Sequence, residues 1–306
     1  MLKTFFVVNP KSAGGQTGKR WLEMHAHVTR ALGTFGHAFT QKPLDAIEIT
    51  RQALRDGYQC IVAVGGDGTI NEVANGFFEG DTVLNPRAAL AVIPRGTGGD
   101  FRRSFEWNLT LKSALDRLKT DDTAPLDVGR LEFTTHENGQ GTRYFVNVCS
   151  FGVSGEVADE ANKSSKVLGG KASFFLASLK TLLRYSDRKV RIGVDGGPLR
   201  EMTITTAAVA NGRFFGGGMQ VAPQASMSDG IFDITLWRGY GLTDFVVKSA
   251  GVYSGDHVKW PGTECMKGTT LVAESDEAVF IDCDGEQPGR LPCRMTVLPG
   301  AIRVKV

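Results

Sequence analysis

Short apolar runs alternate with amphipathic stretches over the first 125 residues. The apolar runs are expected to be strands, at 5–8, 38–41, 60–64 and 89–93. The amphipathic stretches after them are expected to be helices, at 17–32, 44–56, 70–79 and 109–119. Alternation of this kind predicts βα units and a parallel sheet, whose ligands bind in the loops that follow the strands.

The pattern changes after Pro125. Apolar runs separated by Gly, Pro and Asp predict strands at 143–148, 189–194, 202–209, 231–237, 269–273, 278–282 and 295–298. Helical spacing is confined to 154–165, 171–185 and 242–253. The second half is therefore expected to be a mostly antiparallel β-sandwich.

The length of 306 residues suggests two domains at roughly 150 residues each. We expect an α/β domain with a parallel sheet at 1–125 and a β-rich domain at 126–306. Whether the last residues return to the first domain is left open.

The composition of the chain excludes several classes of protein. The net charge of +2 is too small for a dedicated nucleic-acid binder, so no nucleic-acid partner is expected. No window reaches the ~18 apolar residues of a membrane-spanning helix, and the run at 5–8 is too short for a signal peptide, so a cytoplasmic protein is expected. The five cysteines include no C-x-x-C pair, which favours reduced thiols over disulfides or a zinc site.

Glycine accounts for 38 of the 306 residues, more than the usual share of roughly 7%. Three glycine-rich loops follow three of the expected strands. The loops read NPKSAGG at 9–15, GGDGT at 65–69 and PRGTGGD at 94–100. Glycines at a strand-to-helix turn let backbone N–H groups approach a phosphate. None of the three completes a Walker A or a G-x-G-x-x-G motif, and a capping box formed by Thr69 and Glu72 would explain part of the second loop.

These loops resemble the catalytic domain of diacylglycerol, sphingosine and ceramide kinases and of soluble bacterial lipid kinases. The GGDGT loop is also similar to that of NAD kinases. The second half carries further motifs of the bacterial lipid kinases, namely NGRFFGGGM at 211–219, AP at 222–223, DGIFD at 229–233 and DGE at 284–286. Gly99 departs from that family, which commonly has Asn there. The resemblance implies an ATP- and Mg²⁺-dependent kinase acting on the hydroxyl of a lipid such as diacylglycerol. It also implies that 1–125 is the ATP-binding domain and 126–306 the lipid-substrate domain.

The resemblance also implies which residues surround ATP, in a cleft between the domains. They are Asn9, Ser12, Thr40, Gly65, Gly66, Asp67, Gly68, Thr69, Ile70, Asn71, Glu72, Gly96 and Thr97. Thr40 on its residue type alone is equally well an ordinary strand residue.

Carboxylates supply the expected catalytic chemistry. In the family pattern Asp67, Asp100 and Asp127 form a network that holds the catalytic Mg²⁺ through water, and Mg²⁺ commonly keeps waters and uses one or two carboxylates. The DGE element supplies the base for the lipid hydroxyl, either Asp284 or Glu286, with Asp67 as a rival. The alternative for this element is a simple β-turn.

A second metal site is implied by the resemblance alone. A structural Mg²⁺ would be held by the Asp229 carboxylate and the carbonyls of Ser226 and Ile231. Without the resemblance, the same residues form a turn before a strand.

The stretch 163–191 contains eight basic residues and one acid, with apolar residues at helical spacing. It predicts transient contact with an anionic membrane surface, for a protein peripheral on the inner face of the membrane. A helix packed on the sandwich is the alternative, and Phe214 and Phe215 could contact an acyl chain or fill the core. The alternative functions are a NAD kinase and a catalytically silent regulator, and a homodimer is left open.

Overall fold

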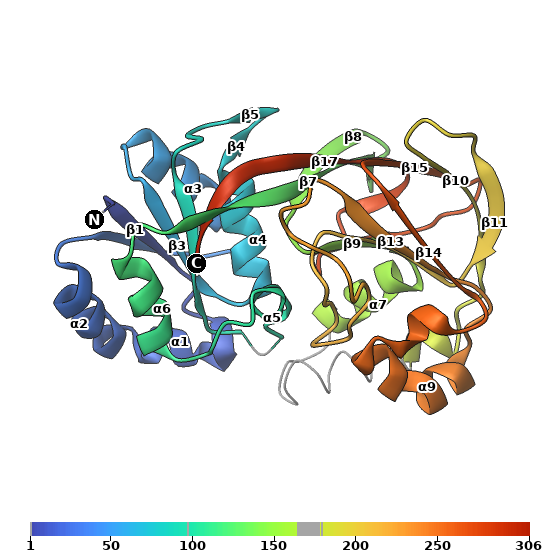
Figure 1. Cartoon of the computed structure of the whole chain (residues 1–306), viewed down its shortest axis with the longest axis horizontal. Coiled ribbons are helices and arrows are strands. Elements are labelled where there is room, and N and C mark those ends of the chain that lie inside the picture. The colour runs from blue at the N-terminus through green and yellow to red at the C-terminus, as the bar shows by residue number, and fades with distance from the viewer. Residues whose placement is uncertain (1, 97, 164–177, 179) are drawn as a thin grey trace. The chain divides into compact units, whose positions relative to one another are not determined.

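The computed structural model describes residues 2–96, 98–163, 178 and 180–306 (Figure 1). The chain forms two compact units. The first unit contains Met1–Asp127 and Pro299–Val306, and the second contains Val128–Leu298. Each unit is described by itself below.

The first unit has a sheet of parallel strands. Its order is β2 (Gly36–Phe39), β1 (Thr4–Val8), β3 (Cys60–Gly65) and β6 (Ala89–Pro94), followed by the end of β17 (Gly289–Lys305). In that last pair Arg303 lies opposite Ala89 and Val304 opposite Leu90. The C-terminal residues thus extend the parallel sheet, and a short hairpin of β4 (Phe78–Glu79) and β5 (Thr82–Val83) stands apart from it.

Helices cover both faces of this sheet because its strands β3 and β6 are buried at every position. Phe6 and Val8 pack against α2 (Trp21–Leu32) and α6 (Leu111–Lys119). The intervening Val7, also fully buried, points to the other face because side chains alternate along a strand. That face is covered by α3 (Asp45–Arg55) and α4 (Asp67–Gly76), which contact each other and the strands.

The four predicted strands of this unit and the helices at 44–56 and 109–119 are confirmed, with ends shifted by a few residues. The helix expected at 17–32 is instead broken at Arg20 into α1 (Gln16–Lys19) and α2, after a 3₁₀ turn η1 (Ser12–Gly15). The helix expected at 70–79 begins earlier, at Asp67, and the short α5 (Asp100–Ser104) was not predicted.

The second unit is the predicted antiparallel sandwich. One sheet has the order β14 (Thr263–Gly268), β13 (Phe232–Trp237), β12 (Thr206–Ala210), β9 (Val148–Gly152) and β16 (Ile281–Cys283). The facing strands are β11 (Arg200–Ile204), β10 (Arg188–Val194), β15 (Thr270–Glu274) and the first part of β17, joined by β7 (Thr123–Thr135) and β8 (Gln140–Phe145). Phe145, Phe151 and Phe232 are fully buried in the core that both sheets share.

Two apolar runs of the sequence each turn out to be two strands. The run 202–209 is divided at Thr205, so that β11 and β12 belong to different sheets. The run 143–148 is divided in the same way into β8 and β9. Consecutive buried residues continue through both divisions, so the apolar runs gave no sign of where one strand ends and the next begins. The strands β7 and β14 were also missed.

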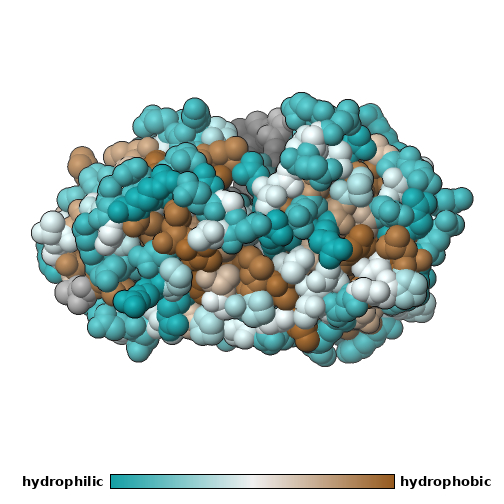
Figure 2. All heavy atoms as spheres, turned by 90° about the horizontal axis from the view of Figure 1, so that it is seen from above, coloured by the Kyte–Doolittle hydropathy of each residue, from teal (hydrophilic) through white to brown (hydrophobic). Residues whose placement is uncertain are grey.

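The second unit includes α7 (Val153–Lys163), α9 (Leu242–Ser254) and the 3₁₀ turn η3 (Asp256–Lys259), and Ser178 and residues 180–182 are helical as well. The predicted helix at 171–185 lies mostly outside the described residues. Within the described ranges, no helix has the length and apolar character needed to cross a membrane. On the face drawn in Figure 2, hydrophobic residues form separate patches among hydrophilic ones.

Candidate functional site

The three glycine-rich loops meet at one edge of the first unit's sheet. They follow β1, β3 and β6, which are parallel neighbours and therefore end on the same side. The Asn9 side-chain Nδ2 donates to Thr69 Oγ1 at 3.0 Å, and the Arg95 N–H donates to the Gly65 carbonyl at 2.7 Å. Direct hydrogen bonds thus connect the first loop to the second and the second to the third.

The second and third loops approach each other backbone to backbone. A Cβ atom placed on Gly96 would lie 2.5 Å from the Gly66 Cα, and one placed on Gly66 would lie 3.0 Å from the Gly96 Cα. A Cβ on Gly65 would lie 2.3 Å from Thr69 Oγ1. Glycine is therefore needed at these positions because any side chain would separate the loops.

Asp67 binds the third loop through both oxygens of its carboxylate. Its Oδ2 accepts the Gly99 N–H at 2.7 Å and its Oδ1 accepts the Phe101 N–H at 3.1 Å. The contact with residue 99 is made by the backbone, and Gly99 has a φ of +69°, a conformation that Asn also tolerates. Glycine in place of the family's asparagine therefore keeps this contact.

Asp100 lies beside Asp67. A Cβ on Gly98 would lie 2.8 Å from Asp67 Oδ2 and 3.9 Å from Asp100 Oδ2, so both carboxylates border the same small space. Arg103 Nη1 pairs with Asp100 Oδ1 at 2.7 Å. Asp127 is 1% exposed, and its Oδ1 accepts the Gly300 N–H at 2.6 Å, which joins β7 to β17.

The carboxylates of Asp67 and Asp100 beside Gly98 are ligands that suit a hydrated Mg²⁺, which binds through one or two carboxylates. A carboxylate has about four lone-pair sites, so Asp67 keeps acceptor capacity beside its two backbone contacts. However, no group of three or more His, Cys, Asp or Glu residues suited to a metal occurs in the described parts of the chain. The network of three aspartates stays a prediction.

Several residues predicted to surround ATP have structural partners. Thr40 is 8% exposed at the end of β2, and its N–H donates to the Val8 carbonyl. Ser12 Oγ donates to Thr17 Oγ1 at 2.6 Å. Glu72 Oε2 accepts the Ala46 N–H at the start of α3. These contacts hold the loops and helices in place whether or not a nucleotide is bound.

Two more predicted residues lie deep in α4. Ile70 is 2% exposed and Asn71 is 9% exposed, and Asn71 Oδ1 accepts from Asn75 at 3.1 Å. Residue 97 lies outside the described residues, so the prediction for Thr97 is not addressed.

The expected capping box is wrong. The residue that precedes α4 is Gly66, whereas Thr69 lies inside the helix and Glu72 binds α3. Because glycine has no side chain, no cap occupies the first N–H groups of α4. Such a helix start, preceded by a glycine loop, favours phosphate binding.

In the second unit, the DGE element is a tight hairpin turn. Asp284 and Gly285 have φ values of +50° and +92°, and Cys283 and Glu286 exchange backbone hydrogen bonds around them. A two-residue turn with positive φ at both central positions is the common hairpin type for Asp-Gly. The β-turn alternative is therefore right about the geometry, and it leaves a role in catalysis open.

The carboxylate of Asp284 holds this turn against the loop between β8 and β9. Its Oδ1 accepts the N–H groups of Asn147 at 3.1 Å and Val148 at 2.8 Å, and its Oδ2 accepts that of Val146 at 2.9 Å. Glu286, in contrast, is an exposed residue of the same turn. Within the element, Asp284 is the anchor and Glu286 faces outward.

Asp282, two residues before the turn, is 5% exposed. Burial raises the pKa of its carboxyl to about 8, with further increases from Asp284 and Glu286, and the N–H of Gly285 opposes the shift. That N–H donates to Asp282 Oδ1 at 2.7 Å. The buried carboxyl of Asp282 thus stabilises the turn by binding the Gly285 N–H. The sequence had not pointed to this residue.

The implied structural metal loop is a surface turn. Asp229 Oδ1 accepts the Ile231 N–H at 3.3 Å, Asp229 is exposed, and Ser226 is half-buried. The Asp229 carboxylate is thus partly used within its own turn, and the metal site formed with the carbonyls of Ser226 and Ile231 stays a prediction.

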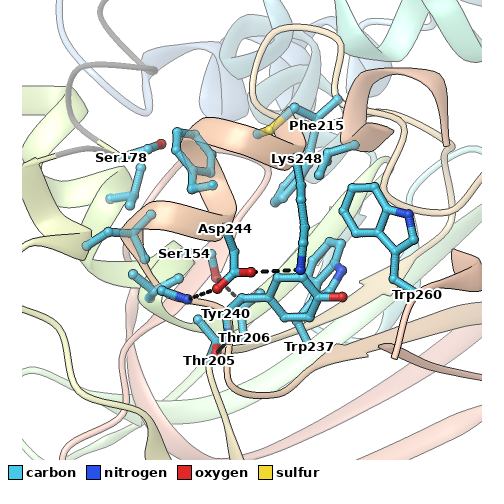
Figure 3. A pocket seen from close by; sticks show the side chains of 17 residues that line it. Ser154, Ser178, Thr205, Thr206, Phe215, Trp237, Tyr240, Asp244, Lys248 and Trp260 are labelled. Carbon is cyan, nitrogen blue, oxygen red and sulfur yellow. Dashed lines mark hydrogen bonds and ion pairs between the residues drawn. The ribbon is translucent and has the colours of Figure 1, made fainter. Parts of the chain in front are cut away.

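The second unit also contains an apolar pocket of about 740 Å³, open mouth included (Figure 3). Its walls come from α7, β12, β13, α9 and the segments between them. The apolar lining includes Val157, Leu182, Phe215, Met219, Trp237 and Val252. Tyr240, Trp260 and the ion pair of Asp244 with Lys248, at 2.7 Å, line it as well.

Of these residues, the sequence had pointed to Phe215 and, within the basic stretch, to Leu182. The i, i+4 spacing of Asp244 and Lys248 could have indicated their pairing. The pocket itself could not be found in this way because its walls come from segments far apart in the chain.

Comparison with known proteins assigns both halves. Residues 3–131 match the diacylglycerol kinase catalytic domain, and residues 147–306 match the YegS C-terminal NAD kinase beta sandwich-like domain. The fold and loops therefore define a kinase of the diacylglycerol kinase class.

Individual relatives cover nearly the whole chain. A "Probable lipid kinase YegS-like" of Pseudomonas aeruginosa is 31% identical over 310 residues, covering 99% of this chain and 93% of the relative. A diacylglycerol kinase of Staphylococcus carnosus is 27% identical over 300 residues, covering 97% and 93%. The chain belongs to the family of bacterial diacylglycerol kinases and YegS-like lipid kinases, and it is a kinase with an alcohol acceptor.

Solved structures show the same fold. A diacylglycerol kinase from Bacillus anthracis has a TM-score of 0.72 at 22% identity, covering 99% of this chain and 96% of that chain. Yeast NADH kinase complexed with NADH has a TM-score of 0.53 at 12% identity, covering 99% and 82%. The likeness to NADH kinase is one of fold.

The approach of Gly66 to Gly96 predicts a sharp sensitivity to one methyl group. Gly96→Ala should lower the free energy of unfolding by about 1–3 kcal/mol and weaken ATP binding, because the two loops must separate. Gly139→Ala is the matched control, since its Cβ meets only Thr135 Oγ1, at 3.4 Å. Chemical unfolding and calorimetric ATP titration measure both effects, and equal behaviour of the two variants would contradict the tight approach.

The buried carboxyl of Asp282 predicts a pH-dependent stability. Its pKa is about 8 in the folded chain against an ordinary value of 3.8. Between pH 3.8 and pH 8 the carboxyl therefore keeps its proton in the folded chain and loses it in the unfolded chain. The free energy of unfolding should therefore fall as the pH rises from about 4 to 8.

Asp282→Asn removes this titration while keeping an acceptor for the Gly285 N–H. The variant should gain stability relative to the wild type between pH 5 and pH 8, by up to a few kcal/mol. Urea unfolding at both pH values measures this, with the exposed Asp121→Asn as control. A constant difference between variant and wild type would contradict the buried, protonated carboxyl.

Proposed function

We propose that the chain is an ATP- and Mg²⁺-dependent kinase that phosphorylates the hydroxyl of a lipid such as diacylglycerol. The observation that carries this proposal is the meeting of three glycine-rich loops at the carboxyl edge of the sheet, next to the uncapped start of α4. Relatives named as diacylglycerol and lipid kinases across nearly the full length support the lipid acceptor over NAD.

The loops of the first unit would bind the phosphates of ATP. The free N–H groups at the start of α4 and the glycine backbone provide donors for phosphate oxygens. Asp67 and Asp100 would hold Mg²⁺, Asp67 in addition to binding the third loop. When bound, Mg²⁺ offsets the negative charge on the phosphate oxygens during transfer.

Glu286 is the proposed base for the lipid hydroxyl. Asp284 accepts three backbone N–H groups, and Asp67 accepts two, so the carboxylates of both rivals are engaged in holding structure. Glu286 lies at the exposed end of an anchored turn, where a carboxylate can accept a proton from an incoming alcohol. We assign Asp284 the role of positioning Glu286.

Glu286→Gln should lower kcat and kcat/KM together by about 10²–10⁴, because a general base acts mainly in the transition state. ATP affinity and stability should remain close to those of the wild type. Asp284→Asn should instead lower stability, since it weakens three hydrogen bonds to a charged group. The measurements are steady-state kinetics with diacylglycerol in mixed micelles, ATP titration and thermal unfolding.

The exposed Glu137→Gln on the hairpin between β7 and β8 is the control for the loss of a surface carboxylate. Normal turnover of Glu286→Gln would contradict its role as base. A folded Asp284→Asn variant that retains both stability and rate would contradict the role of Asp284 as anchor.

We also propose transient contact with anionic membranes through the basic stretch 163–191. Much of its charge is balanced locally, because Arg188 pairs with Glu156 and Glu277, Arg191 with Glu274 and Asp276, and Lys180 with Glu160. The exposed Arg184 and the 68% exposed Leu183 next to it remain at the surface. Lys163, Lys166 and Lys171 have side chains outside the described residues.

Sedimentation with anionic vesicles should therefore be weak and salt-sensitive. Replacing Lys171, Lys180 and Arg184 together by Gln should reduce the bound fraction several-fold at low salt. Binding that is unaffected by either the substitutions or the salt would contradict an electrostatic contact and favour the packed-helix alternative.

A further inference from the structure

Two arginines of α5 lie against the third glycine-rich loop. This short helix directly follows the loop (Figure 1). Arg103 Nη1 donates to the Gly98 carbonyl as well as to Asp100 Oδ1. Arg102 lies across the next residue, Gly99, since a Cβ placed on this glycine would be 2.9 Å from Arg102 Nε and 3.6 Å from its Cγ. Each of the two glycines before α5 is therefore in contact with an arginine side chain.

The Arg102 side chain is held in this place by Trp107. Its Nη1 donates to the Trp107 carbonyl at 3.1 Å, and the Trp107 N–H donates to the Arg102 carbonyl at 3.1 Å. The Nε atom of Arg102 is buried and has no hydrogen-bond partner among the residues that the structure describes. A buried N–H group without an acceptor costs free energy, so hydrogen bonding alone does not explain a guanidinium at this position.

The carboxylates of Asp67 and Asp100 attract the charge of Arg102. Burial and the nearby Arg103 lower the pKa of Arg102, whereas these two carboxylates oppose the shift. Asp67 Oδ2 also accepts the N–H of Gly99, the residue across which Arg102 lies. Two aspartates and two arginines thus meet at this loop, and their formal charges cancel.

This cancellation of charge disfavours a metal ion that arrives alone. Carboxylates bind Mg²⁺ through their negative charge, and a neighbouring cation repels the ion. A nucleotide phosphate carries negative charge, and the same cation attracts it. The pair of Asp67 and Asp100 beside Arg102 therefore favours Mg²⁺ that comes with phosphate over Mg²⁺ by itself.

We propose that Arg102 makes the binding of Mg²⁺ at Asp67 and Asp100 dependent on the nucleotide. The negative charge of the bound phosphates offsets that of the guanidinium, and the carboxylates are then free to attract the metal. The inference rests on the proposed function for ATP as the ligand of the loops, and on the contacts of Arg102 for the role of its charge. Gly99 belongs to the same arrangement because any side chain there would displace the guanidinium.

Removal of the Arg102 charge should change the affinities for metal and nucleotide in opposite directions. Arg102→Gln should raise the affinity of the nucleotide-free protein for Mg²⁺ and lower its affinity for ATP in EDTA, each about three- to tenfold. Calorimetric titrations of the whole protein with MgCl₂ alone, and with ATP in EDTA, measure the two affinities. Comparison with the wild type removes the contribution of any Mg²⁺ bound elsewhere on the chain.

Three further variants separate charge from structure. Arg102→Lys keeps the charge but not the planar group that reaches Trp107, so it should restore both affinities toward those of the wild type. Gly99→Asn keeps a backbone conformation that Asn tolerates, with a φ of +69°, and displaces Arg102, so it should act like Arg102→Gln. The effects of these two substitutions should not add when combined, since they have one cause. Arg30→Gln, at an exposed position of α2, is the control for the loss of a surface charge.

The outcomes distinguish this inference from the proposed function. If both affinities fall in Arg102→Gln, or if Arg102→Lys behaves like Arg102→Gln, Arg102 acts only by holding the loop and the inference is overturned. Unchanged affinities in Arg102→Gln overturn it as well. If the opposite shifts occur and phosphate is transferred to no acceptor, the proposed function fails while this inference stands. Circular dichroism confirms that each variant is folded before its affinities are compared.

Discussion

The close approach of Gly66 and Gly96 is the constraint on which the meeting of the glycine-rich loops depends. The parallel order of β1, β3 and β6 brings three loops to one edge, but only residues without a side chain let two of them touch. Asp67 then fixes the third loop by binding the N–H groups of Gly99 and Phe101. Gly66, which precedes α4, has no side chain that could cap the first N–H groups of this helix. The glycine that allows the two loops to touch therefore also leaves these N–H groups uncapped.

A similar logic applies to the DGE turn of the second unit. Asp284 takes a left-handed backbone conformation that is uncommon for residues other than glycine, and three N–H groups bound to its carboxylate stabilise it there. The buried Asp282 supports the same turn through the Gly285 N–H. Two acids thus serve as structure, whereas Glu286, the third acid of this segment, is exposed at the end of the turn.

The sequence was sufficient to predict a helix or strand where one hydrophobic periodicity extends over the whole element. The strands β1, β3 and β6 and their loops could be predicted because an apolar run followed by a glycine-rich segment marks both the strand and the loop at its end. The divisions at Arg20 and Thr205 could not, since the apolar pattern continues across them while the backbone changes direction. The sequence singled out Asp67 as a candidate site residue, but its bonds to the third loop depend on residues more than thirty positions away.

Ion pairs and the pocket were harder to predict because they also depend on residues far apart in the sequence. The basic stretch looked unbalanced because the acids that pair with Arg188 and Arg191 include residues more than eighty positions later. The pocket is built from five separate segments, none of which signals a cavity by itself. The most direct test of the central claim is phosphate transfer from labelled ATP, in the presence of Mg²⁺, to a panel of diacylglycerol, phosphatidylglycerol, ceramide, sphingosine and NAD. Label in at least one lipid and none in NAD is the predicted result, whereas label in NAD alone, or in no acceptor despite ATP binding, would contradict it.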